Sequence, residues 1–251
     1  MFNLKSFVGK NEKNTSDSIL VEIHNHFLPG LDDGAKDDKE SLSLIKNMHD
    51  LGRKIIVMTP HVMSDMFKNT PETILPKLNH MRSIVENEKI NVELHAAAEY
   101  YVDENFLRLT KENKGILSFG TKKKFVLLET AFINESPYLR EAIFYLQTSG
   151  YVPVLAHPER YTYLYDDFKK YENLFEMNIM FQINILSLIG YYSPKSQKIA
   201  EKLIEAKMVH FLGSDCHNHK QMMALKQAVN TKYYKKALEL NLLNNQIFES
   251  I

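Results

Sequence analysis

The stretch LVEIHNHFLPGLDDG at residues 20–34 begins as a short apolar run and continues into a loop that contains histidine and aspartate. Six more runs of apolar and β-branched residues follow it, separated by stretches whose apolar residues recur at helical spacing. The seven runs span residues 20–24, 54–58, 91–96, 125–129, 152–156, 179–183 and 208–212. Because this alternation is typical of parallel strands joined by crossover helices, the sequence predicts an α/β fold.

Helix signals lie between the strand runs. Three of the intervening stretches carry serine or threonine followed by proline, at residues 70–71, 136–137 and 193–194. This pair favours a helix start, because the hydroxyl caps the first turn and proline is tolerated there. We find no switch point of the kind that an open sheet with helices on both faces needs. Seven strand and helix units therefore favour a closed or nearly closed TIM-like barrel, in a single domain over residues 19–251.

Composition excludes several classes of protein. The 251 residues are 44% hydrophobic and 25% charged, which suits a globular chain with one large core. Lys+Arg 31 and Asp+Glu 31 give a formal net charge of +0, so no basic field gathers nucleic acid. A single cysteine, Cys216, forms no internal disulfide and suits a reducing cytoplasm. No apolar run reaches the roughly 18 residues of a membrane span, and we expect residues 1–18 to form a flexible arm.

Potential metal ligands stand at the ends of almost all the predicted strands. The carboxyl ends of barrel strands share one rim, so residues just beyond them converge. The nine candidates are His24, His26, Asp33, His61, Glu99, Glu129, His157, Asp215 and His217. A single loop histidine is more often a surface residue than a ligand, but chance does not explain the joint pattern. Imidazole and carboxylate suit zinc, manganese or iron, and nine ligands exceed one ion, which indicates a hydrolase-type site with two or three metals.

Competing chemistries lack their required residues. A cysteine-dependent phosphatase needs an arginine six residues after the nucleophile, but that position after Cys216 is Met222. The glycines at 115 and 120 have P-loop spacing, yet Thr121 and Lys122 follow in the wrong order. The sequence therefore favours metal-assisted hydrolysis.

The motifs HNHFLPGLDDG at 24–34, AHPERY at 156–161 and GSDCH at 213–217 resemble those of the PHP (polymerase and histidinol phosphatase) metallophosphoesterases. The chain most closely resembles the bacterial capsule-biosynthesis type of manganese-dependent tyrosine-protein phosphatase. The shorter motifs TPH at 59–61 and LLET at 127–130, with AAEYY around Glu99, extend the resemblance over nearly all of the chain after about residue 20. It implies the PHP fold, a distorted (β/α)7 barrel.

The resemblance also implies a role for each rim residue. The first metal ion would bind His24, His26 and Asp215 with Glu99 as a bridge, the second Glu99, Glu129 and His157, and the third Asp33, His61 and His217. Arg160 resembles the catalytic arginine that faces the phosphate, and its planar guanidinium suits two phosphate oxygens. A salt bridge without a catalytic role is the alternative for Arg160.

The implied reaction is hydrolysis of phosphotyrosine on protein. Water acidified by two or three divalent metal ions, manganese or alternatively iron or zinc, would attack phosphorus in line as hydroxide. The implied partner is the tyrosine-rich tail of a bacterial tyrosine kinase that controls capsule or exopolysaccharide synthesis, in the cytoplasm. Two departures from the family pattern are Glu22, in place of the usual aspartate, and the absence after His217 of an arginine that some relatives have. We expect Glu22 to orient a ligand histidine.

Three other functions stay open from the sequence. The same site could hydrolyse a small phosphoester such as histidinol phosphate. An amidohydrolase-like barrel would cleave C–N bonds, but such sites usually have lysine where Glu129 stands. A degenerate barrel could act as a binding module, which the complete ligand set disfavours. Tyr100, Tyr101, Tyr191 and Tyr192 are candidates for a substrate groove or for buried packing.

Overall fold

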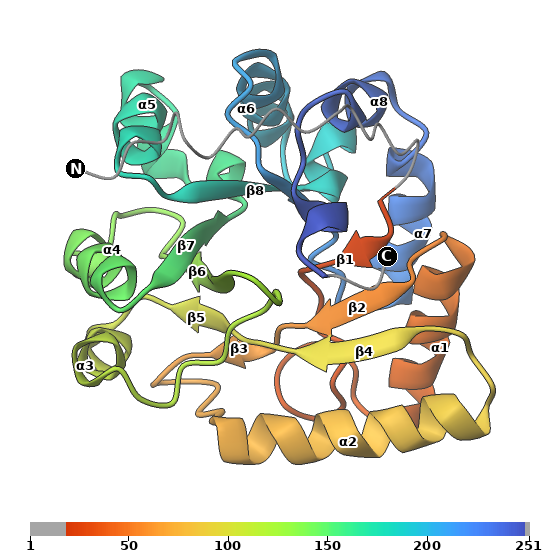
Figure 1. The fold of residues 1–251 in the computed structure, drawn as a ribbon. Coiled ribbons are helices and arrows are strands. Elements are labelled where there is room, and N and C mark those ends of the chain that lie inside the picture. The colour runs from red at the N-terminus through yellow and green to blue at the C-terminus, as the bar shows by residue number, and fades with distance from the viewer. Residues whose placement is uncertain (1–18, 249–251) are drawn as a thin grey trace.

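The computed structural model describes residues 19–248, which form parallel strands with helices outside them (Figure 1). The predicted arm at residues 1–18 lies outside the described residues. No helix within the described part is long and apolar enough to cross a membrane.

The strands form two parallel sheets. The first sheet has the order β1 (Val21–Glu22), β2 (Ile55–Met58) and β4 (Glu93–Ala96). The second has the order β3 (His61–Val62), β5 (Glu99–Tyr101), β6 (Lys124–Glu129), β7 (Tyr151–Ala156), β8 (Met180–Asn184) and β9 (Phe211–Gly213). Two residues separate β2 from β3 and two separate β4 from β5, so each pair is one strand run that passes from the first sheet to the second.

All seven predicted strand runs contain a strand, and the predicted α/β fold is confirmed. The last begins later than expected, because β9 starts at Phe211 instead of residue 208. The short strands β3 and β5 were not predicted.

The edges β1 and β9 meet without a continuous ladder among residues 19–248. At their carboxyl ends, Asn25 and Cys216 form one parallel bridge, and the Asp215 N–H donates to the His24 carbonyl at 2.7 Å. Farther down, the Asn244 side chain stands between the strands, donating to the carbonyls of Val21 and Leu212 at 3.0 and 2.8 Å. The ring of strands is therefore distorted at this seam, where hydrogen bonds of one inserted side chain replace ladder pairs.

Eight α-helices cover the outside of the sheets in the described part (Figure 1). They are α1 (Asp38–Asp50), α2 (Pro71–Asn87), α3 (Glu104–Glu112), α4 (Leu139–Thr148), α5 (Lys169–Glu176), α6 (Pro194–Glu205), α7 (His219–Ala228) and α8 (Lys232–Leu238). Short 3-10 turns include η2 (Pro158–Arg160), η3 (Thr162–Leu164), η4 (Ile185–Ile189) and η5 (Asn244–Gln246).

The predicted helix starts hold at two of three positions. Helices α2 and α6 begin at Pro71 and Pro194, as expected. The start predicted at Ser136 is wrong, because α4 begins at Leu139. The Ser136 hydroxyl instead donates to the Val102 carbonyl at 2.6 Å, which fixes the loop before the helix.

Strand alternation divides the core into two apolar clusters. One face of the strands packs against the helices. The side chains on the opposite face fill the barrel interior and include Val57, Leu127, Val154, Phe125 and Phe211. The rings of Phe125 and Phe211 meet edge to face with centroids 5.3 Å apart. This close-packed apolar interior lies next to the polar ends of the strands and limits their movement.

Half-buried His210 is expected to make the fold less stable in acid. Its Nδ1 accepts a hydrogen bond from the Phe181 N–H at 3.1 Å, and burial lowers its pKa to about 4. As the pH falls below about 6.5, His210 therefore takes up a proton in the unfolded chain but not in the folded chain. The free energy of unfolding consequently falls as the pH drops towards 4. In His210→Gln this loss should be smaller by about 2 kcal/mol at pH 5, as urea unfolding at pH 7 and pH 5 would measure.

The exposed His219 supplies the control for this experiment. His219→Gln should retain the full acid sensitivity. Equal loss of stability in the wild type and in His210→Gln would contradict the prediction.

Candidate metal centre

The nine predicted ligands converge at the carboxyl ends of the strands, with Glu99 at their centre. Glu99 is fully buried, and its Oε2 lies 3.2 Å from His24 Nε2, 3.5 Å from His26 Nε2 and 3.1 Å from His61 Nδ1. Its Oε1 lies 3.1 Å from His157 Nε2. One carboxylate thus contacts imidazoles from three parts of the barrel: after β1, at the start of β3 and after β7.

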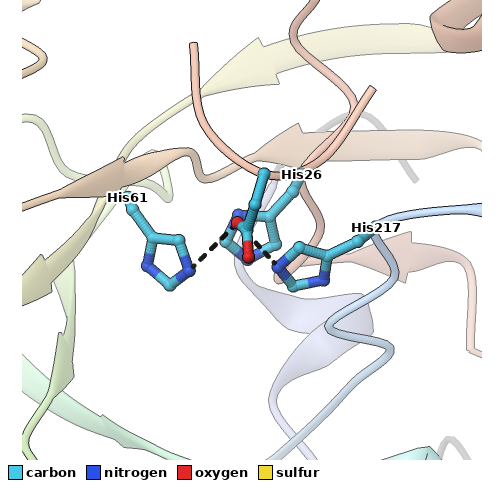
Figure 2. A group of neighbouring side chains, drawn as sticks. His26, His61 and His217 are labelled. Atoms are coloured by element: carbon cyan, nitrogen blue, oxygen red, sulfur yellow. Dashed lines mark ion pairs between the residues drawn. The ribbon is translucent and has the colours of Figure 1, made fainter. Parts of the chain in front are cut away.

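Three groups of side chains bring their ligand atoms within 4.8 Å of one another. They are His24, His26, Glu99 and Asp215; His61, Glu99 and Glu129; and His26, Asp33, His61 and His217. Figure 2 shows the rings of His26, His61 and His217 turned towards one another. The His26 and His217 rings stack, with their centroids 3.8 Å apart.

The first group is the set that the resemblance implied for one ion. The second contains His61 where His157 was expected, although His157 Nε2 lies 3.5 Å from Glu129 Oε1. The third adds His26 to the expected set. Asp33, with 61% of its side chain exposed, lies 3.4 Å from His217 Nε2.

Four inward-facing atoms of this cluster have no hydrogen-bond partner among residues 19–248. They are Nε2 of His24 and His26, Nδ1 of His61 and Oε2 of Glu99, and all four are buried. A buried polar atom without a hydrogen bond destabilises a fold by about 1–3 kcal/mol. Four such atoms lie together here. Imidazole nitrogens and carboxylate oxygens converging in this way fit a divalent cation.

The outward-facing ring nitrogens are held by other side chains. His24 Nδ1 lies 2.8 Å from Gln182 Oε1, and His26 Nδ1 lies 2.7 Å from Asp32 Oδ2. In the neutral imidazole, an acceptor on Nδ1 keeps the proton there and leaves Nε2 free, which is the form that binds metal. Both histidines are therefore oriented as ligands.

The two central carboxyl groups have opposite pKa shifts. Burial would raise the pKa of Glu99, but the neighbouring His24 and His61 outweigh it and hold that pKa well below its usual value. Burial, together with the charges of Glu99 and Asp215, raises the pKa of Glu129 well above its usual value. The protein alone thus lacks the positive charge to keep both groups ionised, which bound cations would supply.

Arg160 lies beside the cluster. Its Nη1 donates to Asp215 Oδ2 at 2.7 Å, and its guanidinium packs 4.6 Å from the Phe132 ring and 4.0 Å from the Tyr192 ring. Within the described part of the chain, its other nitrogens make no hydrogen bond, and 19% of the side chain is exposed. The guanidinium is therefore held in place while part of the side chain stays accessible.

Backbone geometry around two of the ligands is strained. His157 and Asp215 have φ of 34° and 49°, in the left-handed region that non-glycine residues seldom adopt. Such strain concentrates at functional sites, where the surrounding structure holds it. Gly213 lets the strands approach closely, because a Cβ there would lie 2.8 Å from both His24 Cβ and Gln182 Nε2.

Several residues around the ligands were not predicted from the sequence. Gln182 stands as a polar residue inside an apolar strand run, a signal that was available. Asn184, which the end of the sixth strand run already placed at the rim, donates to Asp215 Oδ2 at 2.9 Å. The role expected for Glu22 is wrong, because its Oε1 accepts from the backbone N–H groups of His24 and Ser214 and not from an imidazole. Glu22 therefore joins β1 to the loop after β9.

Two of the four tyrosines considered for a substrate groove, Tyr100 and Tyr192, have different surroundings. Tyr100 is buried and stacks on Phe106 at 4.8 Å. Tyr192 lies against Arg160, and its hydroxyl accepts from Asn184 Nδ2 at 2.9 Å. Of these two, only Tyr192 therefore lies at the site.

Asp32→Asn is expected to weaken metal binding. Asp32 Oδ2 holds His26 Nδ1 and also accepts from the His61 N–H at 2.9 Å, so it positions two ligands. Loss of such a partner typically costs about 10–100-fold in affinity or activity. A manganese titration of activity should shift by that factor, whereas the exposed Asp50→Asn should not shift it. An unchanged titration in Asp32→Asn would show that Asp32 does not orient the ligands.

Comparison with known proteins identifies relatives of the whole described chain. The family model described as "Capsular polysaccharide synthesis, CpsB/CapC" matches residues 20–247. CapC of Staphylococcus aureus is 32% identical over 235 residues, covering 91% of this chain and 90% of the relative. The tyrosine-protein phosphatase YwqE of Bacillus subtilis is 30% identical over 202 residues, covering 80% and 78%.

Solved structures give the same result. One described for YwqE of Bacillus subtilis and CpsB of Streptococcus pneumoniae as metal-dependent tyrosine phosphatases aligns with a TM-score of 0.74 and 26% identity, covering 88% of this chain and 95% of that one. An amidohydrolase from Mycoplasma synoviae, with a TM-score of 0.53 and 12% identity over 93% of this chain and 88% of that one, shares the fold. The resemblance seen in the sequence is confirmed, and the chain belongs to the CpsB/CapC family of capsular polysaccharide synthesis.

Proposed function

We propose that this chain is a metal-dependent protein-tyrosine phosphatase whose nine rim histidines and acids bind two or three divalent ions. One observation carries the proposal: buried ligand atoms of His24, His26 and His61, which have no hydrogen-bond partner in the described part of the chain, converge on Glu99. Relatives that cover most of this chain are named as tyrosine-protein phosphatases, which supports the choice of substrate.

The donor set favours hard or borderline metals. Imidazole and carboxylate suit manganese, which we propose first, with iron and zinc as alternatives. Burial raises the pKa of the Cys216 thiol, and its sulfur donates towards the Asn218 carbonyl, so a thiolate ligand is disfavoured. When bound, such ions acidify water towards neutrality and neutralise phosphate charge.

The chain's own residues bind and orient the phosphoester. Arg160 presents accessible N–H groups to non-bridging phosphate oxygens, and Asp215 with Asn184 keeps that guanidinium in place. Gln182 and Asp32 hold the imidazoles in their ligand orientation. The phenol of tyrosine has a pKa near 10, so the leaving group needs less help from a general acid than an alkyl alcohol does.

The proposed physiological partner is the phosphorylated, tyrosine-rich tail of a bacterial tyrosine kinase in the cytoplasm. Membership of a family for capsular polysaccharide synthesis supports a substrate in that process.

A panel of phosphoesters tests the proposal. Purified protein should release phosphate from a tyrosine-rich phosphopeptide, lose that activity with a chelator, and regain it when manganese is added. The control substrates are histidinol phosphate and a phosphoserine peptide. Equal or better hydrolysis of histidinol phosphate would overturn the tyrosine phosphatase proposal in favour of a small-molecule phosphatase. Opening of a cyclic amide, with no phosphoester cleaved, would favour an amidohydrolase.

A further inference from the structure

An exposed apolar pair stands at the rim of the metal centre. Phe132, in the loop between β6 and α4, is 37% exposed, and the adjacent Ile133 is 73% exposed. The Phe132 ring lies 5.8 Å from the His157 ring and 4.6 Å from the Arg160 guanidinium. Large apolar side chains are usually buried, so an exposed pair beside a polar site points to a ligand.

The backbone of this loop is fixed. The Phe132 carbonyl accepts two hydrogen bonds from Thr162, from its N–H at 2.7 Å and from its hydroxyl at 2.8 Å. Thr162 begins η3, two residues after Arg160. The exposed ring is therefore held at a set position relative to the guanidinium, which reduces the entropy lost when a ligand packs on it.

Two other aromatic residues beside the site already have hydrogen-bond partners. Tyr192 is half-buried, and its hydroxyl accepts from Asn184. Tyr161 is fully buried, and its hydroxyl accepts from the Thr130 N–H at 3.2 Å. Phe132 is more exposed than either of them and is a hydrocarbon ring with no hydrogen-bonding group of its own.

We propose that Phe132 is the specificity-determining wall that packs against the phenyl ring of phosphotyrosine while Arg160 holds the phosphate. Ile133 then contacts a neighbouring apolar residue of the substrate peptide. This inference rests on the proposed phosphatase function. Aromatic pairs add about three- to tenfold in affinity beyond simple burial, so this wall favours an aryl phosphate over a ligand that has no ring.

The test compares a substrate that has the ring with a ligand that lacks it. For Phe132→Ala we expect kcat/KM for a phosphotyrosine peptide to fall about tenfold, while the inhibition constant of inorganic phosphate stays unchanged. Phe132→Tyr should restore most of the loss, because it keeps a ring. Phe144→Ala is the matched control, since Phe144 is 59% exposed on α4.

Ile133 is tested by the length of the substrate. Ile133→Ala should lower kcat/KM about threefold for the peptide and leave free phosphotyrosine unaffected.

Two outcomes of Phe132→Ala would overturn the proposal. Equal weakening of the peptide and of inorganic phosphate would mean that Phe132 only supports Arg160. No change in either would mean that the ring is not a contact. Failure of the phosphatase function itself is distinguishable, because the wild-type protein would then not hydrolyse the phosphotyrosine peptide at all.

Discussion

Replacing Glu99 by glutamine is expected to lower kcat by more than about a hundredfold and to reduce the number of metal ions bound. The physical reason is that Glu99 contacts four imidazoles and belongs to two of the three ligand groups. An amide offers one neutral oxygen where the carboxylate offers two charged ones. Loss of outer partners alone typically costs about 10–100-fold, so loss of a shared ligand should cost more.

Elemental analysis and single-turnover kinetics of the same preparation would measure both effects. Glu205→Gln is the matched control, because Glu205 is an exposed carboxylate that pairs with Lys236 and Tyr233. Full metal content and wild-type turnover in Glu99→Gln would rule out a bridging role for this residue.

Arg160→Ala is expected to lower kcat/KM by about a hundredfold or more while the metal content stays at the wild-type level. Removal of a positioned donor to a charged transition state typically costs about 10²–10³ in rate. The guanidinium faces the site but is not a metal ligand, so activity and metal binding should separate in this variant. In Glu99→Gln both should fall together.

Phosphate inhibition and metal analysis distinguish the two interpretations of Arg160. If it binds substrate, the inhibition constant of inorganic phosphate rises and the ions stay. If its salt bridge with Asp215 only supports that ligand, the ions are lost with the activity. Arg140→Ala, which removes an exposed arginine paired with Glu135, should change neither quantity.

The strand positions were accessible from the sequence because apolar runs report burial on both faces of a parallel sheet. Phe125 to Glu129 and Val152 to Ala156, for example, coincide closely with β6 and β7. The short strands β3 and β5 were missed, since two or three residues carry no periodicity. The seam between β1 and β9 was also missed, because it depends on Asn244, 32 positions from its partner Leu212.

The ligand types were accessible for a different reason. Residues at strand ends share a rim whatever their separation in the chain, so His24 and Asp215 could be placed together. The contact between Gln182 and His24 could not be placed, because a glutamine inside an apolar run shows only that it is unusual and packing determines which residue it contacts. The exposure of Phe132 was equally inaccessible, because an aromatic residue in a loop predicts burial and exposure equally well.

Crystals grown with manganese and measured by anomalous diffraction would locate the ions. We predict anomalous peaks within the three ligand groups, with Glu99 shared between two of them, and their disappearance after chelation together with the phosphatase activity. Activity that survives chelation in crystals with no anomalous peak at these residues would contradict the metal centre.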